Sequence, residues 1–192
     1  MALAGLGFGI FLDLKFHDIP NTVAGAVAAA AELPKVHLLT LHTLGGAAMM
    51  RAATKAVAGR KKRPGLLGVT ILTSLDEAAL GSVGISGTPA KRAVELARLA
   101  QEAGLDGVVA SGHEARAIRA ACGPKFLIVV PGVRPAGAAT NDQSRIMTPT
   151  QAIEAGADYL VVGRPISEAK NPRAEALSIS LDIDRIRRSP TT

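Results

Sequence analysis

The chain repeats one pattern six times: a short apolar run rich in β-branched residues, then a turn, then an alanine-rich stretch with helical spacing. None of the runs alternates cleanly between apolar and polar positions, which is typical of strands buried on both faces of a parallel sheet. The pattern therefore predicts six strand–helix units. The apolar runs lie near residues 9–16, 36–42, 66–72, 105–111, 126–131 and 158–164.

Capping signals mark several of the predicted helices. Thr22 is placed to cap a helix that runs through VAGAVAAAAEL, and Thr88 precedes a proline suited to the first helical position. Thr148 and Gln151 have the spacing of a capping box. Glycines are expected where helices stop before the next strand, at Gly104, Gly123 and Gly156.

Strand–helix alternation of this kind predicts an α/β fold, either a doubly wound sheet or a closed (β/α)₈ barrel. No G-x-G-x-x-G sequence follows a strand, which weakens the dinucleotide-binding alternative. Unusual polar residues gather just past the strand ends, where barrels build their sites, so a TIM barrel is favoured. We expect residues 1–192 to form one barrel domain with a flexible tail at 182–192. Six units are two fewer than a closed barrel needs.

Composition narrows the class of protein. The 192 residues are 48% hydrophobic, which is enough for one domain with a substantial core. No apolar run approaches a membrane span, and Asp13 and Lys15 interrupt the apolar stretch that a signal peptide would need. Cys122 is the only cysteine, which excludes an internal disulfide and a cysteine-based metal cluster. We therefore expect a cytoplasmic protein that has no membrane partner.

The formal charge of +6 raises the question of nucleic-acid binding. The basic residues concentrate at 60–63 and 185–188, in an expected loop and tail, and aromatic residues make up only 3% of the chain. Single-stranded nucleic acid usually stacks on aromatic side chains beside a basic groove. We therefore predict a solvated basic surface and no nucleic-acid partner, although the excess charge also favours an anionic small substrate.

The segment FLDLKFHDIPNTV carries the densest candidate chemistry. On a strand, Asp13 and Lys15 point to one face, toward the barrel interior, and Asp18 follows in the next loop. A lysine held between carboxylates suits a general acid better than a Schiff-base nucleophile. The alternative is a structural ion pair that only fixes a strand end, and the three residues alone do not exclude it.

Arginines follow the last two predicted strands. Arg134 and Arg164 each lie beside a glycine or a short loop of small residues, where their planar forks suit a phosphate group. Barrels commonly bind phosphate in the loops after their last two strands. Gln143 and the backbone N–H of Gly163 add donors in the same loops. Solvated surface arginines are the alternative, and the loop at 137–140 is either a cover for a ligand or ordinary flexible surface.

Other polar residues give weaker signals. Thr73 and Ser74 follow the third predicted strand and offer hydroxyls to a polar ring in the barrel mouth, although such a pair often only caps the next element. The four histidines show no paired metal-ligand spacing. His42 ends a strand just before Gly45 and Gly46, where it either lines the site or has a structural role, and we favour the structural role.

Five segments together resemble the bacterial-type orotidine 5′-phosphate decarboxylases, in family order across nearly the whole chain. They are DLKFHDIPNTV (13–23), GVTILTSL (68–75), GLDGVVAS (104–111), PGVRP with the downstream NDQSRIMTP (131–149), and AGADYLVVGRPI (155–166). The resemblance implies a TIM-barrel carboxy-lyase that converts orotidine 5′-phosphate to UMP in pyrimidine biosynthesis. It also implies that the enzyme uses neither a metal nor an organic cofactor.

The resemblance assigns roles to the candidate residues. Lys15 is implied to protonate the C6 carbanion left when CO₂ departs, and Asp13 to lie near the substrate's carboxylate. Asp18 and Thr22 are implied to reach into a partner subunit's site, so the expected assembly is a homodimer with shared active sites. The implied contacts to the pyrimidine are Thr73 and Ser74, and those to the phosphate side of the substrate are Arg134, Gln143, Gly163 and Arg164.

Members of the family begin with two further strand–helix units, which supply an aspartate near the ribose and a lysine of the charge network. Here we expect a barrel without those units, explained by a misassigned start codon, a fragment or a shortened homologue. The strands at 9–16 and 158–164 would then be open edges. Two other functions remain: a related Mg-dependent sugar-phosphate decarboxylase or aldolase-like barrel, and an inactive truncated homologue that binds nucleotide.

Overall fold

A six-stranded sheet forms the centre of the molecule. The computed structural model describes residues 3–134 and 147–188. Every neighbouring pair of strands is parallel, and the strands follow chain order across the sheet. The strands are β1 Ile10–Phe16, β2 Val36–His42, β3 Gly65–Val69, β4 Gly107–Val109, β5 Leu127–Val130 and β6 Tyr159–Leu160.

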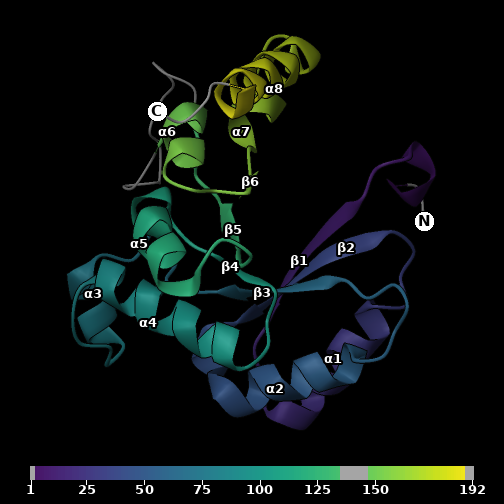
Figure 1. The fold of residues 1–192 in the computed structure, drawn as a ribbon, viewed down its shortest axis with the longest axis vertical. Coiled ribbons are helices and arrows are strands. Elements are labelled where there is room, and N and C mark those ends of the chain that lie inside the picture. The colour runs from purple at the N-terminus through teal and green to yellow at the C-terminus, as the bar shows by residue number, and fades with distance from the viewer. Residues whose placement is uncertain (1–2, 135–146, 189–192) are drawn as a thin grey trace.

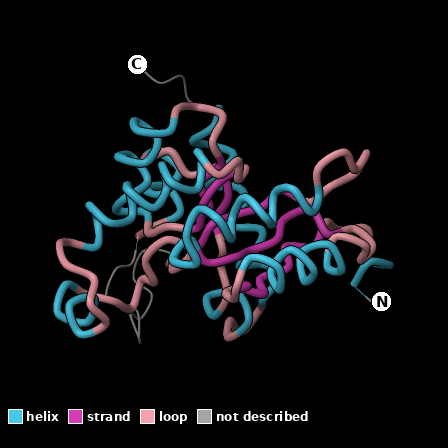
Figure 2. The backbone as a smooth tube through the Cα atoms, turned by 90° about the horizontal axis from the view of Figure 1, so that it is seen from below, coloured by secondary structure: helices cyan, strands magenta, loops and turns pink. Residues whose placement is uncertain are grey.

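The sheet curls into an open half-barrel with helices packed along its outer side, as Figures 1 and 2 show from two directions. Within the described residues, β1 and β6 each pair on one side only, so they form the two edges of the sheet. The fold class expected from the sequence, a (β/α) barrel type with six units, is confirmed. The helices are α1 Pro20–Ala30, α2 Gly46–Val57, α3 Glu77–Ser82, α4 Pro89–Glu102, α5 Gly112–Cys122, α6 Pro149–Glu154, α7 Arg164–Ser167 and α8 Pro172–Arg188, with 3₁₀ turns η1 Leu3–Leu6 and η2 Thr43–Gly45.

The main core lies between the outer face of the sheet and the helices. Leu39 and Leu41 of β2 are fully buried in one cluster with Val23 of α1 and Met49 of α2. Burying an aliphatic side chain of this size contributes about 1.5–3 kcal/mol. Because successive residues of a strand point to opposite faces, this outward packing turns Thr40, between the two leucines, toward the inner face where the site lies.

Asp106 ties together the segments that begin β3 and β4. Its carboxylate accepts hydrogen bonds from the guanidinium of Arg63 at 2.6 and 2.7 Å and from the backbone N–H of Leu66 at 2.7 Å. The hydrogen bond to Asp106 is the largest cause of the raised pKa of Arg63. A bidentate pair of this kind fixes geometry as well as charge.

Asp158 repeats this arrangement just before β6. Its carboxylate accepts the N–H of Ile128 at 2.7 Å and Nη2 of Arg119 at 2.6 Å. Arg119 also donates to three backbone carbonyls, those of Gly123, Phe126 and Gly156. Both carboxylates act at the amino ends of the strands, away from the face where barrels build their sites, so their contribution is to stability.

Two of the predicted helix starts are confirmed. Thr88 and Thr148 each accept the N–H three residues further on, and Gln151 completes the capping box with Thr148. Thr22 is not a cap, which corrects the sequence-based expectation: α1 begins at Pro20, with Ile19 as its N-cap. Proline fixes a φ suited to the first helical position, so the helix starts three residues earlier than expected. The helix-ending glycines adopt positive φ, at Gly104, Gly123 and Gly156.

Helix α8 extends into the region expected to be a flexible tail. The structure places residues up to Arg188 in this helix, so 182–188 are helical, while 189–192 lie outside the described residues. Ile179 anchors the helix by its burial, and Asp182 pairs with Arg185 one turn away at 3.6 Å. Among the described residues, no helix has the length and apolar character needed to cross a membrane.

Candidate active site

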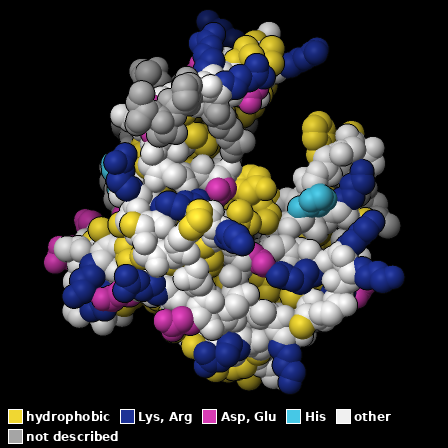
Figure 3. All heavy atoms as spheres, in the orientation of Figure 1, with side chains coloured by type: hydrophobic (Ala, Val, Ile, Leu, Met, Phe, Trp, Pro, Cys, Tyr) yellow, Lys and Arg dark blue, Asp and Glu magenta, His cyan; other side chains and the backbone are white. Residues whose placement is uncertain are grey.

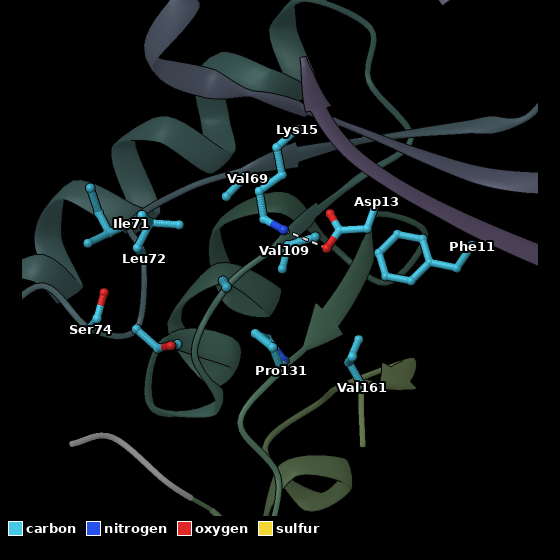
Figure 4. Close-up of a pocket in the computed structure, with 12 residues that line it drawn as sticks. Phe11, Asp13, Lys15, Val69, Ile71, Leu72, Ser74, Val109, Pro131 and Val161 are labelled. Carbon is cyan, nitrogen blue, oxygen red and sulfur yellow. Dashed lines mark hydrogen bonds and ion pairs between the residues drawn. The ribbon is translucent and has the colours of Figure 1, made fainter. Parts of the chain in front are cut away.

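A cavity of about 280 Å³ opens at the carboxyl ends of the strands, on the inner face of the sheet. This end of a parallel sheet is where barrels bind ligands. Figure 4 shows that residues from β1, from the segment after β3 and from the β5 and β6 ends converge on it. The residues that line the cavity are Phe11, Asp13, Lys15, Val69, Ile71, Leu72, Thr73, Ser74, Val109, Ala110, Pro131 and Val161.

The charged pair predicted from the sequence lies in this cavity. Nζ of Lys15 is 2.5 Å from Oδ2 of Asp13, and the two side chains point toward one another (Figure 4). The Lys15 and Asp13 side chains are 42% and 43% exposed, so both can reach a ligand. The structure therefore confirms that the two side chains share the inner face.

The backbone reaches this geometry by an irregular strand rather than by a regular pleat. Lys15 has a φ of +49°, the left-handed region that non-glycine residues rarely adopt. The β1–β2 register shifts between Leu12, which pairs with Leu39, and Phe16, which pairs with Leu41. Four residues of β1 thus span the length of two in β2. Strained backbone of this sort is typical of functional sites.

The hydroxyl residues after β3 lie where the sequence places them. Thr73 and Ser74 both line the cavity, in the turn that precedes α3. Ile71 and Leu72 line the same wall, so this side combines apolar surface with two hydroxyls. Such a wall suits a flat ring that carries polar atoms at its edge.

His42 lies close enough to the charged pair for both charges to act on it, although it is not among the residues that line the cavity. Its ring centroid is 5.2 Å from that of His17, and Nδ1 is buried without a hydrogen-bond partner among the described residues. Burial lowers the pKa of His42, the positive charges of His17 and Lys15 lower it further, and Asp13 acts in the opposite direction. The signal in the sequence was its spacing of two from Thr40 in VHLLTLH, which gives both side chains the inner face.

Asp18 and Thr22 do not line the cavity of their own chain. Both residues are exposed. The Asp18 carboxylate accepts the N–H of Ile19 at 2.6 Å, and Thr22 lies in the first turn of α1. The structure thus brings Asp13 and Lys15 together with the cavity but leaves Asp18 outside it.

Arg134 follows β5 and is 5% exposed, so the interpretation as a solvated surface arginine is wrong for this residue. Its side-chain Nη1 donates to the carbonyl of Val133 at 3.1 Å, and its backbone N–H donates to the carbonyl of Met147 at 3.0 Å. Gly163 and Arg164 lie after β6, at the start of α7. Gln143, like the loop at 137–140, lies outside the described residues.

Basic side chains are spread over the face seen in Figure 3, beside a deep notch between the α8 region and the arm formed by η1 and β1. Large apolar side chains are exposed on both of these parts, with Phe8 73% and Leu177 59% exposed. Within the described ranges, no group of three or more histidine, cysteine or acidic side chains is arranged to hold a metal ion.

The fold and the site define a class: a parallel (β/α) barrel protein with an acid–lysine pair in a cavity at the carboxyl ends of its strands. Residues 1–179 match the model of the orotidine 5′-phosphate decarboxylase / HUMPS family. The chain belongs to this family.

Curated relatives and a solved structure support the same family assignment. The orotidine 5′-phosphate decarboxylase of Nitrosococcus oceani is 53% identical over 184 residues, covering 96% of this chain and 79% of the relative. The Trichlorobacter lovleyi protein of the same name is 58% identical over 166 residues, covering 85% and 68%. The crystal structure of the Lactobacillus acidophilus orotidine 5′-phosphate decarboxylase superposes with a TM-score of 0.82 at 37% identity, covering 95% of this chain and 79% of that one.

Proposed function

We propose that this chain is a cytoplasmic carboxy-lyase that decarboxylates orotidine 5′-phosphate to UMP in pyrimidine biosynthesis. The observation that carries the proposal is the Asp13–Lys15 pair, 2.5 Å apart and exposed to a cavity at the carboxyl end of the sheet. Membership in the family supports the reaction. The roles given to individual residues rest on the geometry and on the resemblance.

Lys15 acts as the proton donor. Loss of CO₂ from C6 leaves a carbanion, and the ammonium offers three N–H donors beside that carbon. The proton moves from Nζ to C6, and the neutral amine takes a proton from solvent before the next turnover. Asp13 holds the ammonium and lies near the substrate's carboxylate, so its negative charge disfavours the starting anion more than the transition state.

The remaining cavity walls bind the rest of the nucleotide. Thr73 and Ser74 offer hydroxyls to the polar edge of the pyrimidine, while Ile71 and Leu72 contact its face. Phosphate is held by residues after the last two strands, through the side chains of Gln143 and Arg164, the N–H of Gly163 and the buried Arg134. Binding energy from the remote phosphate is available to organise the reacting end.

The active enzyme is a homodimer with shared sites. Asp18 and Thr22 are exposed and lie outside their own chain's cavity, which supports their acting in a partner's site instead. Both belong to the segment that carries Asp13 and Lys15, so a two-fold axis near this segment brings the two sites together.

A steady-state assay tests the function. Incubation with orotidine 5′-phosphate should change its ultraviolet absorbance as UMP forms, with EDTA present throughout. Lys15→Met should lower turnover by at least about 100-fold, the scale of general acid catalysis. Lys91→Met is the matched control, because Lys91 is exposed on α4 away from the cavity. Its turnover should equal that of the wild type.

Other outcomes separate the alternatives. Activity on a keto-sugar phosphate that EDTA abolishes would replace the proposal with a magnesium-dependent enzyme of the same fold. Calorimetric binding of UMP without any turnover would indicate a nucleotide-binding homologue.

A further inference from the structure

Thr40 of β2 forms hydrogen bonds with both residues of the charged pair, Asp13 and Lys15. Its side chain is fully buried, and its Oγ1 donates a hydrogen bond to Oδ1 of Asp13 at 2.8 Å. The same oxygen accepts the backbone N–H of Lys15 at 2.9 Å. The hydroxyl thus uses its donor and its acceptor capacity on the two residues that the proposed reaction needs.

The Asp13 carboxylate is fixed at both of its oxygens. Oδ2 contacts Nζ of Lys15, and Oδ1 contacts Thr40. The ion pair alone holds this arrangement weakly, because both of its side chains are more than 40% exposed and exposed ion pairs are screened by water. Thr40 is the rigid, buried member of the three, so it sets the plane of the carboxylate and hence the position of the ammonium.

Thr40 also supports the unusual backbone of Lys15. The left-handed φ of +49° and the register shift beside it remove Lys15 from the regular β1–β2 ladder. Its N–H therefore bonds to the Thr40 hydroxyl instead of a carbonyl of β2. The bond is partly buried, and an N–H shielded from water without a partner costs free energy, so this bond stabilises the conformation that directs the Lys15 side chain into the cavity.

We propose that Thr40 is a positioning residue for the proposed decarboxylation, acting through its hydroxyl on the Asp13 carboxylate and the Lys15 backbone. The proposal rests on the proposed function. Thr40 does not line the cavity, so it affects the chemical step without contributing to substrate affinity. Valine has the same shape and lacks the hydroxyl, whereas serine keeps it.

Kinetics of three variants test the proposal. Thr40→Val should lower kcat by about 10- to 100-fold, the cost of misplacing a catalytic group by up to about 1 Å, with KM changed less than about threefold. Thr40→Ser should restore kcat to within about threefold of the wild type. Thr54→Val is the matched control, because the Thr54 hydroxyl, on helix α2, donates to the carbonyls of Met50 and Ala103 and not to the charged pair.

Several results would overturn it. Thr40→Val with a kcat within threefold of the wild type, or Thr40→Ser as impaired as Thr40→Val, would show that the hydroxyl is not the cause. A loss of activity explained wholly by a smaller folded fraction, measured by circular dichroism, would reduce Thr40 to a structural residue.

Amide hydrogen exchange at the Lys15 N–H separates failure of this proposal from failure of the proposed function. The N–H should be protected in wild type and Thr40→Ser and exchange at least about tenfold faster in Thr40→Val, since the hydroxyl that accepts it is lost. Wild type without turnover but with this pattern would refute the decarboxylation and keep Thr40 as the anchor of the pair. Unchanged exchange in Thr40→Val would refute the anchoring role whether or not the wild type is active.

Discussion

Replacing Asp158 by alanine should destabilise the chain strongly, although the residue lies far from the cavity. The substitution leaves the N–H of Ile128 without the carboxylate at 2.7 Å and removes the charged partner of Arg119 at 2.6 Å. A hydrogen bond to a charged group contributes about 1.5–3 kcal/mol. The ion pair adds about 0.5–1 kcal/mol, because its side chains are 22% and 31% exposed and partly screened. The total loss is therefore about 2–4 kcal/mol of the roughly 5–15 kcal/mol that stabilise a typical domain.

Urea unfolding followed by circular dichroism measures this loss directly, as a change in the free energy of unfolding at an unchanged slope. Asp182→Ala is the control: its pair with Arg185 spans 3.6 Å and is largely exposed, so its loss should be about 0–0.5 kcal/mol. If Asp158→Ala costs less than about 1 kcal/mol, or no more than Asp182→Ala, then the paired carboxylates before β4 and β6 do not stabilise the sheet as argued.

Three other features give measurable expectations. Lys15→Met and Asp18→Asn chains, each inactive alone, should recover about a quarter of wild-type turnover after joint refolding, because about half of the dimers are mixed and each holds one intact site; no recovery would refute shared sites. The pKa of His42 is lowered from 6.5 in the folded chain, so His42 is protonated at a higher pH in the unfolded chain than in the folded one. Stability therefore falls as the pH drops below about 6.5. The fall should be smaller in His42→Asn when the free energy of unfolding is measured by urea titration at several pH values. An equal fall in the variant and the wild type would contradict this expectation. A Cβ on Gly107 would lie 2.3 Å from a carbonyl oxygen of β5, so Gly107→Ala should cost about 1–3 kcal/mol in thermal melts, whereas Gly25→Ala, with open space around it on α1, should be neutral or stabilising.

Much of the fold follows from local pattern. The apolar runs predicted the strands because strands in the middle of a parallel sheet are continuous β-branched segments, and this local pattern does not depend on distant contacts. The capping box at Thr148 was predictable since all of its partners lie within four residues. Asp13 and Lys15 were expected on one face from their spacing alone, and they are found there.

The features that the sequence did not predict depend on contacts between distant segments. The role of Thr40 needs the lateral register of β1 against β2, including its shift before Phe16, which no local pattern encodes. The lowered pKa of His42 arises from burial and from charges on β1 and the following loop. The sequence groups Asp18 with Asp13 and Lys15, but its place outside the cavity depends on how the chain turns into α1.

In the proposed reaction, Lys15 delivers a proton to C6 of the nucleotide in this cavity. The most direct measurement is mass spectrometry of the product formed from orotidine 5′-phosphate in D₂O, with released CO₂ quantified in parallel. The proposed reaction predicts UMP carrying one solvent-derived deuteron at C6 and an equal amount of CO₂ from the wild type, with both formed at least about 100-fold more slowly by Lys15→Met. Unchanged orotidine 5′-phosphate with the wild type, or deuterated UMP at the wild-type rate from Lys15→Met, would contradict it.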